Sequence, residues 1–346
     1  MKKTLATLTL GSLSLFAQNT EHSTHDTSCS CNDSHSIAHF APAGVMGAHA
    51  HKEGEWMVGT RSMFMEMDGL RDGTNRVSNS EAHKDYMALP RDMKMQMHML
   101  DVMYGLNDDW TLTLMIPWVR YSMNLNRRMN MMGTTTDTKF KTRNEGLGDI
   151  KVGSIYRAYD DGNEQVLLGL TLNLPTTNFD EESNTPMGDD TRLGYPMQIG
   201  SGTWDFIPSI VYNQFHDNWG WGTKLEATIH TDRNSEGYRR GDKLTYNIWA
   251  SRELNPVFAL NSGLEFNAWE DYHGEDDKLE PMSGMNPVAD ADLRGGKNSS
   301  LFGGFTWKTC AKSKVQFEAG MPFYQEIDGP NLETDYTVNI NFLYSF

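Results

Sequence analysis

The chain has 346 residues, a net charge of −16, three cysteines and a mean hydropathy of −0.57. The acidic charge argues against nucleic-acid binding, and three cysteines are too few for a scaffold held together by disulfides. After the N-terminal leader no run of about 18 apolar residues occurs, which excludes membrane-spanning helices. It does not exclude a membrane-spanning β-barrel, because a barrel strand keeps only alternate residues apolar.

The N-terminal end predicts an exported protein. Lys2 and Lys3 precede a short apolar run at residues 5–16, and Ala17 is a suitable last residue before cleavage. We interpret residues 1–17 as a secretory signal peptide. The alternative is a short buried helix, but only a polar segment follows it to pack against.

Residues 18–52 are rich in Ser, Thr, Asp and His, and we expect a loosely held periplasmic segment that could plug a barrel. Imidazole and thiolate are ligands for soft or borderline metals such as copper, although the spacing matches no closed zinc module. A solvated polar leader is the alternative interpretation. The candidate metal ligands of this segment are His39, His49, His51, Cys29 and Cys31.

Residues 53–346 predict an all-β protein, a transmembrane antiparallel up-and-down β-barrel of about twelve strands. Short connections, such as residues 106–109, alternate with mostly longer ones, such as 66–93 and 122–147. Short periplasmic turns and long extracellular loops are typical of outer-membrane barrels. The predicted strands are 55–65, 94–105, 110–121, 148–158, 164–174, 203–214, 221–232, 243–254, 257–269, 300–310, 314–324 and 335–346.

The alternation also assigns the two faces of the barrel wall. Leu112, Leu114 and Trp118 should face lipid, and Thr111 and Thr113 should face the lumen. The last predicted strand places aromatic and aliphatic side chains on one face and finishes on Phe346. Such an end is typical of outer-membrane barrels, and we expect the barrel-assembly machinery to recognise Phe346.

Charged side chains on the predicted lumen face are candidates for a solute path. An ion-paired, closed interior is the alternative interpretation. These residues are Arg61, Asp101, Lys151, Arg157, Lys224, Glu226, His230, Glu265 and Glu318.

Methionine is unusually frequent, with 22 residues, and many of them recur with period two on the predicted lumen face of the first three strands. Thioether sulfur prefers Cu(I), so the stripe could hold copper. Flexible methionines that merely fill the lumen are the alternative. The candidate sulfur ligands are Met63, Met65, Met95, Met97 and Met99.

Signals for catalysis are weak. The chain contains no Gly-x-Ser-x-Gly elbow, no phosphate loop and no dinucleotide fingerprint. His98 near the outer rim is the one candidate base, and no Ser or carboxylate is clearly placed to serve it. The sequence therefore predicts that the protein is not an enzyme.

Seven stretches carry a family resemblance, together with His49 and His51: residues 39–47, 54–57, 97–100, 146–153, 172–176, 195–203 and 293–297. They resemble the outer-membrane proteins grouped as transporters of the meta-pathway of phenol degradation. The resemblance covers residues 39–346 and implies an outer-membrane barrel with a transport role. It supplies no substrate and no catalytic residues.

The sequence therefore predicts an exported β-barrel of the bacterial outer membrane through which a small solute passes passively. A copper-handling barrel that uses the His/Cys segment and the methionines is the alternative. A third possibility is a structural barrel whose loops contact other cells or partners.

Overall fold

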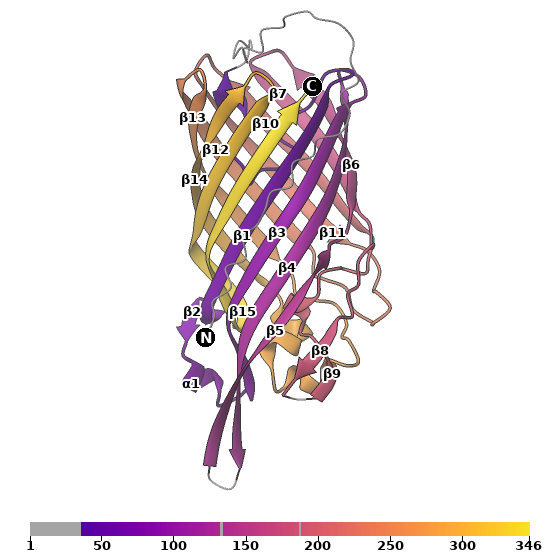
Figure 1. The fold of residues 1–346 in the computed structure, drawn as a ribbon, viewed down its shortest axis with the longest axis vertical. Helices are drawn as coiled ribbons and strands as arrows, with labels where there is room; N and C mark the ends of the chain where they lie inside the picture. Colours follow the sequence, from indigo (N-terminus) through magenta and orange to yellow (C-terminus); the bar gives the residue numbers. More distant parts are fainter. Residues whose placement is uncertain (1–35, 132–133, 187) are drawn as a thin grey trace, which may run out of the picture.

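The computed structural model describes residues 36–131, 134–186 and 188–346. In these residues a 13-stranded antiparallel sheet closes into a barrel (Figure 1). The ring consists of β1 Trp56–Gly73, β3 Ala88–Gly105, β4 Trp110–Met131, β6 Lys151–Asp160, β7 Glu164–Asn173, β10 Asp205–Phe215, β11 Trp219–His230, β12 Lys243–Asn255, β13 Phe258–Trp269, β14 Gly296–Cys310 and β15 Ser313–Ser345.

Outside the ring, β2 pairs with β1 and β5 pairs with β4, while β8 and β9 form a separate pair. No helix among the described residues is long and apolar enough to cross a membrane. The bounds of these elements are β2 Asn75–Val77, β5 Thr134–Leu147, β8 Glu182–Thr185, β9 Gly188–Arg192, α1 Asn79–Ala82, α2 Glu280–Ser283, η1 Ile37–His39, η2 Tyr195–Met197, η3 Pro287–Ala289 and η4 Ala291–Leu293.

Strand β15 spans the barrel wall twice, once in each half of its length. Its 33 residues pair with β14 in the first half and with β1 in the second, antiparallel in both cases. The N–H of Ser345 donates to the carbonyl of Lys312 at 2.8 Å, so the two ends of β15 lie side by side. Eleven ring elements therefore give twelve crossings, which confirms the predicted strand number and satisfies the even count that closure requires.

The predicted loop at residues 122–147 is wrong. Strands β4 and β5 pair from Trp118 opposite Leu147 to Met131 opposite Thr134, and this hairpin extends beyond the barrel (Figure 1). Strands β1 and β3 also continue past their predicted outer ends. These extensions lie outside the apolar band, so their side chains lack the lipid-facing alternation on which the prediction relied.

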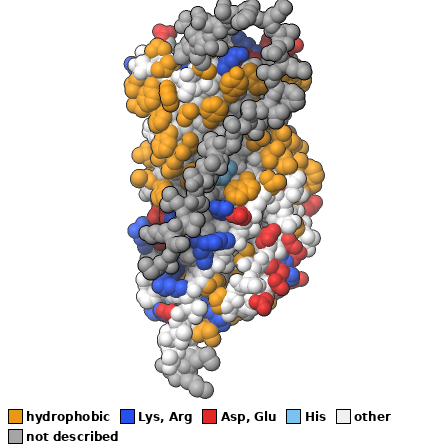
Figure 2. Space-filling model, viewed as in Figure 1, with side chains coloured by type: hydrophobic (Ala, Val, Ile, Leu, Met, Phe, Trp, Pro, Cys, Tyr) orange, Lys and Arg blue, Asp and Glu red, His pale blue; other side chains and the backbone are white. Residues whose placement is uncertain are grey.

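The predicted faces are confirmed by exposure. Leu112, Leu168 and Leu260 are exposed, whereas Thr111 and Thr113 are buried. Figure 2 shows the outward apolar side chains gathered over one end of the molecule, with charged side chains more frequent toward the other. An outer surface this apolar is stable in lipid rather than in water.

Residues 36–52 lie inside the barrel at the end where the short turns are found. Wall side chains hold this segment by its backbone: Asn341 donates to the carbonyl of Ala43 at 2.9 Å, and Lys224 to that of Met46 at 2.8 Å. Further donors are Asn213 to the carbonyl of Ala48 and Gln316 to that of Ala41. We call residues 36–52 the plug.

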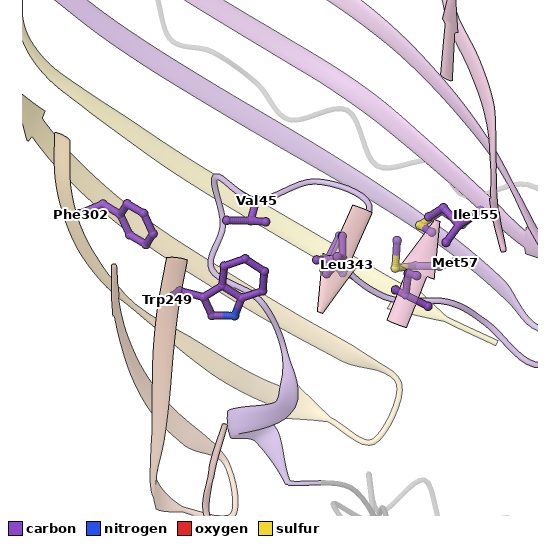
Figure 3. Close-up of a cluster of buried hydrophobic side chains, with 10 residues drawn as sticks. Val45, Met57, Ile155, Trp249, Phe302 and Leu343 are labelled. Carbon is purple, nitrogen blue, oxygen red and sulfur yellow. The ribbon is translucent and has the colours of Figure 1, made fainter. Parts of the chain in front are cut away.

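An apolar layer surrounds the plug. In Figure 3, Val45 lies between Trp249 and Phe302 on one side and Leu343 and Met57 on the other. These wall residues come from β12, β14, β15 and β1, so the layer reaches across the barrel. The lumen is therefore narrowed by apolar packing at the periplasmic end.

Candidate functional site

The predicted lumen charges face inward and most of them are paired. Lys224 Nζ lies 2.6 Å from Glu226 Oε2, and His230 Nδ1 lies 2.8 Å from Asp205 Oδ1. Arg61 Nε is 3.6 Å from Asp101 Oδ2. The interior is thus largely ion-paired. This agrees with the ion pairing expected in the alternative interpretation of the sequence, an ion-paired, closed interior.

The remaining predicted lumen residues also have partners or line a cavity. Arg157 Nε is 3.6 Å from an oxygen of Asp160, and Glu265 accepts hydrogen bonds from Asn247 and Asn267. Lys151 lines a small cavity of about 40 Å³ together with Lys224 and Glu226. Glu318 accepts from the N–H of Gly44, which ties it to the plug.

The methionines form a stripe on the lumen face of β1, β3 and β4, interrupted on β1 by Arg61 and on β3 by Asp101. Met63 pairs with Met97, Met65 with Met95, and Met67 with Met93 across the two strands. Side chains directly opposite in an antiparallel pair share one face and lie about 4.5–5.5 Å apart at Cβ. We call the stripe the Met ladder: Met57, Met63, Met65, Met67, Met93, Met95, Met97, Met99, Met103, Met115 and Met123.

The Met ladder links two cavities. At the periplasmic end Met57, Met103 and Met115 line the inner pocket, a cavity of about 40 Å³ whose other wall includes His49 of the plug. At the extracellular end Met67 and two further methionines line the outer pocket, a cavity of about 180 Å³. Between the two pockets, an apolar solute would meet the thioether side chains of β1 and β3.

The outer pocket is mainly apolar. An engineered apolar cavity of about 150 Å³ is known to take benzene, so the outer pocket has room for one aromatic ring. One charged group, Arg294, lines it as well. Its apolar lining includes Met67, Met93, Met123, Trp269, Val288 and Leu293.

Extracellular loops that fold inward complete this pocket. Their inward fold was not predicted from the sequence. Val288 packs with Leu193 and Met197 against Met93 and Met123 of the wall. Arg240 holds the neighbouring loop by donating to the carbonyls of residues 198 and 200, both at 2.8 Å. The inward fold could have been predicted from the apolar residues of these loops, because a loop exposed to water carries few apolar side chains.

The predicted metal ligands do not form a recognisable metal site. His39 Nε2 lies 2.8 Å from the carbonyl of His216, and the rings of His49 and His51 are 5.2 Å apart. Within the described ranges, no group of three or more His, Cys, Asp or Glu could hold a metal ion. Cys29, Cys31 and the predicted signal peptide lie outside the described residues.

The Met candidates for copper all lie on the Met ladder, half-buried or buried toward the lumen. They are spread over successive rungs rather than gathered around one point with a histidine. The predicted lumen face of Met63, Met65, Met95, Met97 and Met99 is thus correct, while their copper chemistry gains no support.

His98 faces outward, and the structure corrects the expectation that no serine serves it. Ser62 Oγ lies 2.9 Å from His98 Nδ1, and the imidazole stacks on Trp118. Within the part of the chain that the structure describes, no carboxylate hydrogen-bonds to this histidine. The pair therefore lacks the third group that orients the base in a catalytic triad.

Comparison with known proteins places this architecture. The family described as "Putative MetA-pathway of phenol degradation" matches residues 86–281. The crystal structure of an outer membrane channel from Pseudomonas putida F1 covers 87% of this chain and 99% of its own, with 14% identity and a TM-score of 0.59. No curated protein sequence matches.

Two further solved structures are more distant. The P. putida toluene transporter TodX has 9% identity and a TM-score of 0.45, covering 85% of this chain and 90% of its own. The CymD monoaromatic hydrocarbon channel has 10% identity and a TM-score of 0.42, covering 86% and 89%. The similarity to the P. putida F1 channel shows that the fold is that of an outer-membrane β-barrel.

Proposed function

The chain belongs to the family described as "Putative MetA-pathway of phenol degradation", and on this premise we propose that it is a passive channel for a small, mainly apolar solute. Barrels of this fold reside in the bacterial outer membrane. The observation that carries the proposal is the outer pocket of about 180 Å³, lined by Met67, Met93, Met123 and Trp269. Flexible, polarisable thioethers adapt to ligands of different shape and contact aromatic rings favourably.

The proposed route runs along the Met ladder. A solute reaches the outer pocket from the extracellular side, moves along the thioether stripe, and arrives at the inner pocket beside the plug. The inner pocket, at about 40 Å³, is too small for an aromatic ring while the plug is seated. Movement of the plug is therefore the gating step of this proposal.

The proposal also covers catalysis, metal binding and the C-terminal residue. We propose no catalytic role and no resident metal, because the channel requires neither. Phe346 is exposed and its N–H pairs with the carbonyl of Trp56 at 2.9 Å, which closes the last strand onto the first. Recognition of this residue by the barrel-assembly machinery is part of the proposal.

Equilibrium binding of radiolabelled toluene to the purified full-length protein in detergent tests the outer pocket. The wild type should bind toluene saturably, and Met67→Trp should weaken binding about tenfold or more, because the indole fills the cavity. Met285→Trp is the control, since Met285 is exposed on a loop and does not line the pocket. Equal binding by Met67→Trp and the wild type would remove the outer pocket from the proposed route.

A further inference from the structure

The outer pocket contains a partly buried cation that forms no ion pair with the described residues. Arg294 lines the pocket, and its Nε is buried with no hydrogen-bond partner in the described residues. One terminal nitrogen donates to the carbonyl of Pro287 at 3.0 Å. No ion pair joins this guanidinium to a carboxylate within the ranges that the structure describes.

Two acidic residues whose charges act on Arg294 accept hydrogen bonds from the loop backbone. Asp271 Oδ1 accepts from the backbone N–H groups of Arg294 and Gly295, and Asp290 Oδ1 accepts from the N–H of Asp292. These carboxylates cap the loop backbone rather than the guanidinium. Burial lowers the pKa of Arg294, opposed by Tyr272 and by these two acids, but an arginine remains charged at any physiological pH.

An unpaired buried cation is costly, and proteins normally provide it with an anion. A guanidinium presents parallel N–H donors that match the two oxygens of a carboxylate. The remainder of the pocket is mainly apolar, with thioether, aliphatic and indole side chains beside the polar side chains of Asn298, Gln325, Asn331 and Thr334, and it has room for one ring. Together these features fit a ligand with an aromatic ring at one end and a carboxylate at the other.

We propose that the outer pocket binds a small aromatic carboxylate, with its ring against Met67, Met93 and Trp269 and its carboxylate on Arg294. This rests on the proposed channel function and specifies the class of solute. The carboxylate would accept from N–H groups of the two terminal guanidinium nitrogens, because the Nε–H is enclosed by protein. Neutral rings of the same size would occupy the same space without this anchor.

The chain offers a closely matched control in Arg127. Its guanidinium also donates to the carbonyl of a loop proline, Pro186, at 2.8 Å, and its Nε is likewise buried without a hydrogen-bond partner in the described residues. It does not line the outer pocket. Arg294→Gln and Arg127→Gln therefore remove two arginines in comparable environments. Only Arg294→Gln should weaken binding of the carboxylate.

Calorimetric titration of the full-length protein with sodium benzoate and with benzyl alcohol tests the proposal. The wild type should bind benzoate about tenfold or more tightly than the alcohol, a ratio typical of one charge-assisted contact. Arg294→Gln should abolish this preference, while Arg127→Gln should bind both compounds as the wild type does.

Equal wild-type affinities for benzoate and benzyl alcohol would overturn the proposal, whether or not Arg294→Gln folds. A preference that survives in Arg294→Gln would overturn it as well. If neither compound nor toluene binds the wild type, the proposed function itself fails. If toluene and benzyl alcohol bind but benzoate gains nothing, only the carboxylate assignment fails.

Discussion

At the scale of single residues, the lumen side chains could be predicted from the sequence. Arg294, the charged residue that lines the outer pocket, could not. Met63, Met97 and Asp101 were assignable because period-two alternation determines the face of a strand residue. Arg294 lies between η4 and β14 in a long connection, where no periodicity constrains the direction of a side chain. Its role depends on loop packing that brings residue 294 beside Met67.

His49 of the plug gives a prediction at this scale. Burial, followed by the nearby positive charges of His51, Lys314 and Arg61, lowers its pKa well below the usual 6.5. A displaced plug would bind a proton on His49 below pH 6.5, whereas the seated plug resists it. The stability of the seated plug is therefore complete above pH 6.5 and decreases as the pH falls below it.

We expect the ionic conductance of the protein in planar bilayers to rise when the pH is lowered from about 7.5 to about 5.5. His49→Gln should reduce this pH response, and His98→Gln on the outer face should not. A response of wild-type size in His49→Gln would show that another group controls the plug. His51 shares the burial, so the double variant His49→Gln/His51→Gln should respond least.

At the scale of elements, the break between β5 and β6 is held by one buried carboxylate. Asp149 accepts hydrogen bonds from the N–H groups of Thr176, Thr177 and Ser201, the last at 2.8 Å, and from the side chains of Ser201 and Asn173. It thereby fastens the loop after β7 to the wall where β6 begins. The sequence showed the Gly-Leu-Gly-Asp stretch but not this function, because its partners are about 24–52 residues away.

Asp149→Ala should lower the free energy of unfolding by about 2–4 kcal/mol, since several buried donors lose their acceptor together. Urea unfolding of the refolded barrel, followed by tryptophan fluorescence, measures this change. Asp137→Ala is the control, because Asp137 is exposed and forms a surface ion pair with Arg128. If the two variants unfold alike, Asp149 does not fasten the loop.

The Met ladder gives a second prediction at this scale. Replacing Met63, Met65, Met95 and Met97 together by Leu keeps the stripe apolar, so toluene uptake should be nearly unchanged. Replacing the same four residues by Gln should reduce uptake several-fold, because an apolar solute would then cross amide groups that prefer water. Equal uptake by the Gln and Leu variants would show that the solute does not follow this wall.

At the scale of the whole molecule, the barrel could be predicted closely because lipid on one side and a polar lumen on the other impose alternation on every crossing strand. All twelve crossings lie near their predicted positions. The β4–β5 hairpin and the inward-folded loops could not be predicted, since no lipid boundary orders their side chains. The outer pocket is formed where these two kinds of structure meet.

Passive passage of a small apolar solute across the outer membrane is the function that we propose for this barrel. Its most direct test is the initial rate of radiolabelled toluene accumulation by cells with and without the protein in their outer membrane, before and after de-energisation. We expect a faster rate with the protein, rising in proportion to external concentration and unaffected by de-energisation. An equal rate in cells that lack the protein, or a rate abolished by de-energisation, would contradict it.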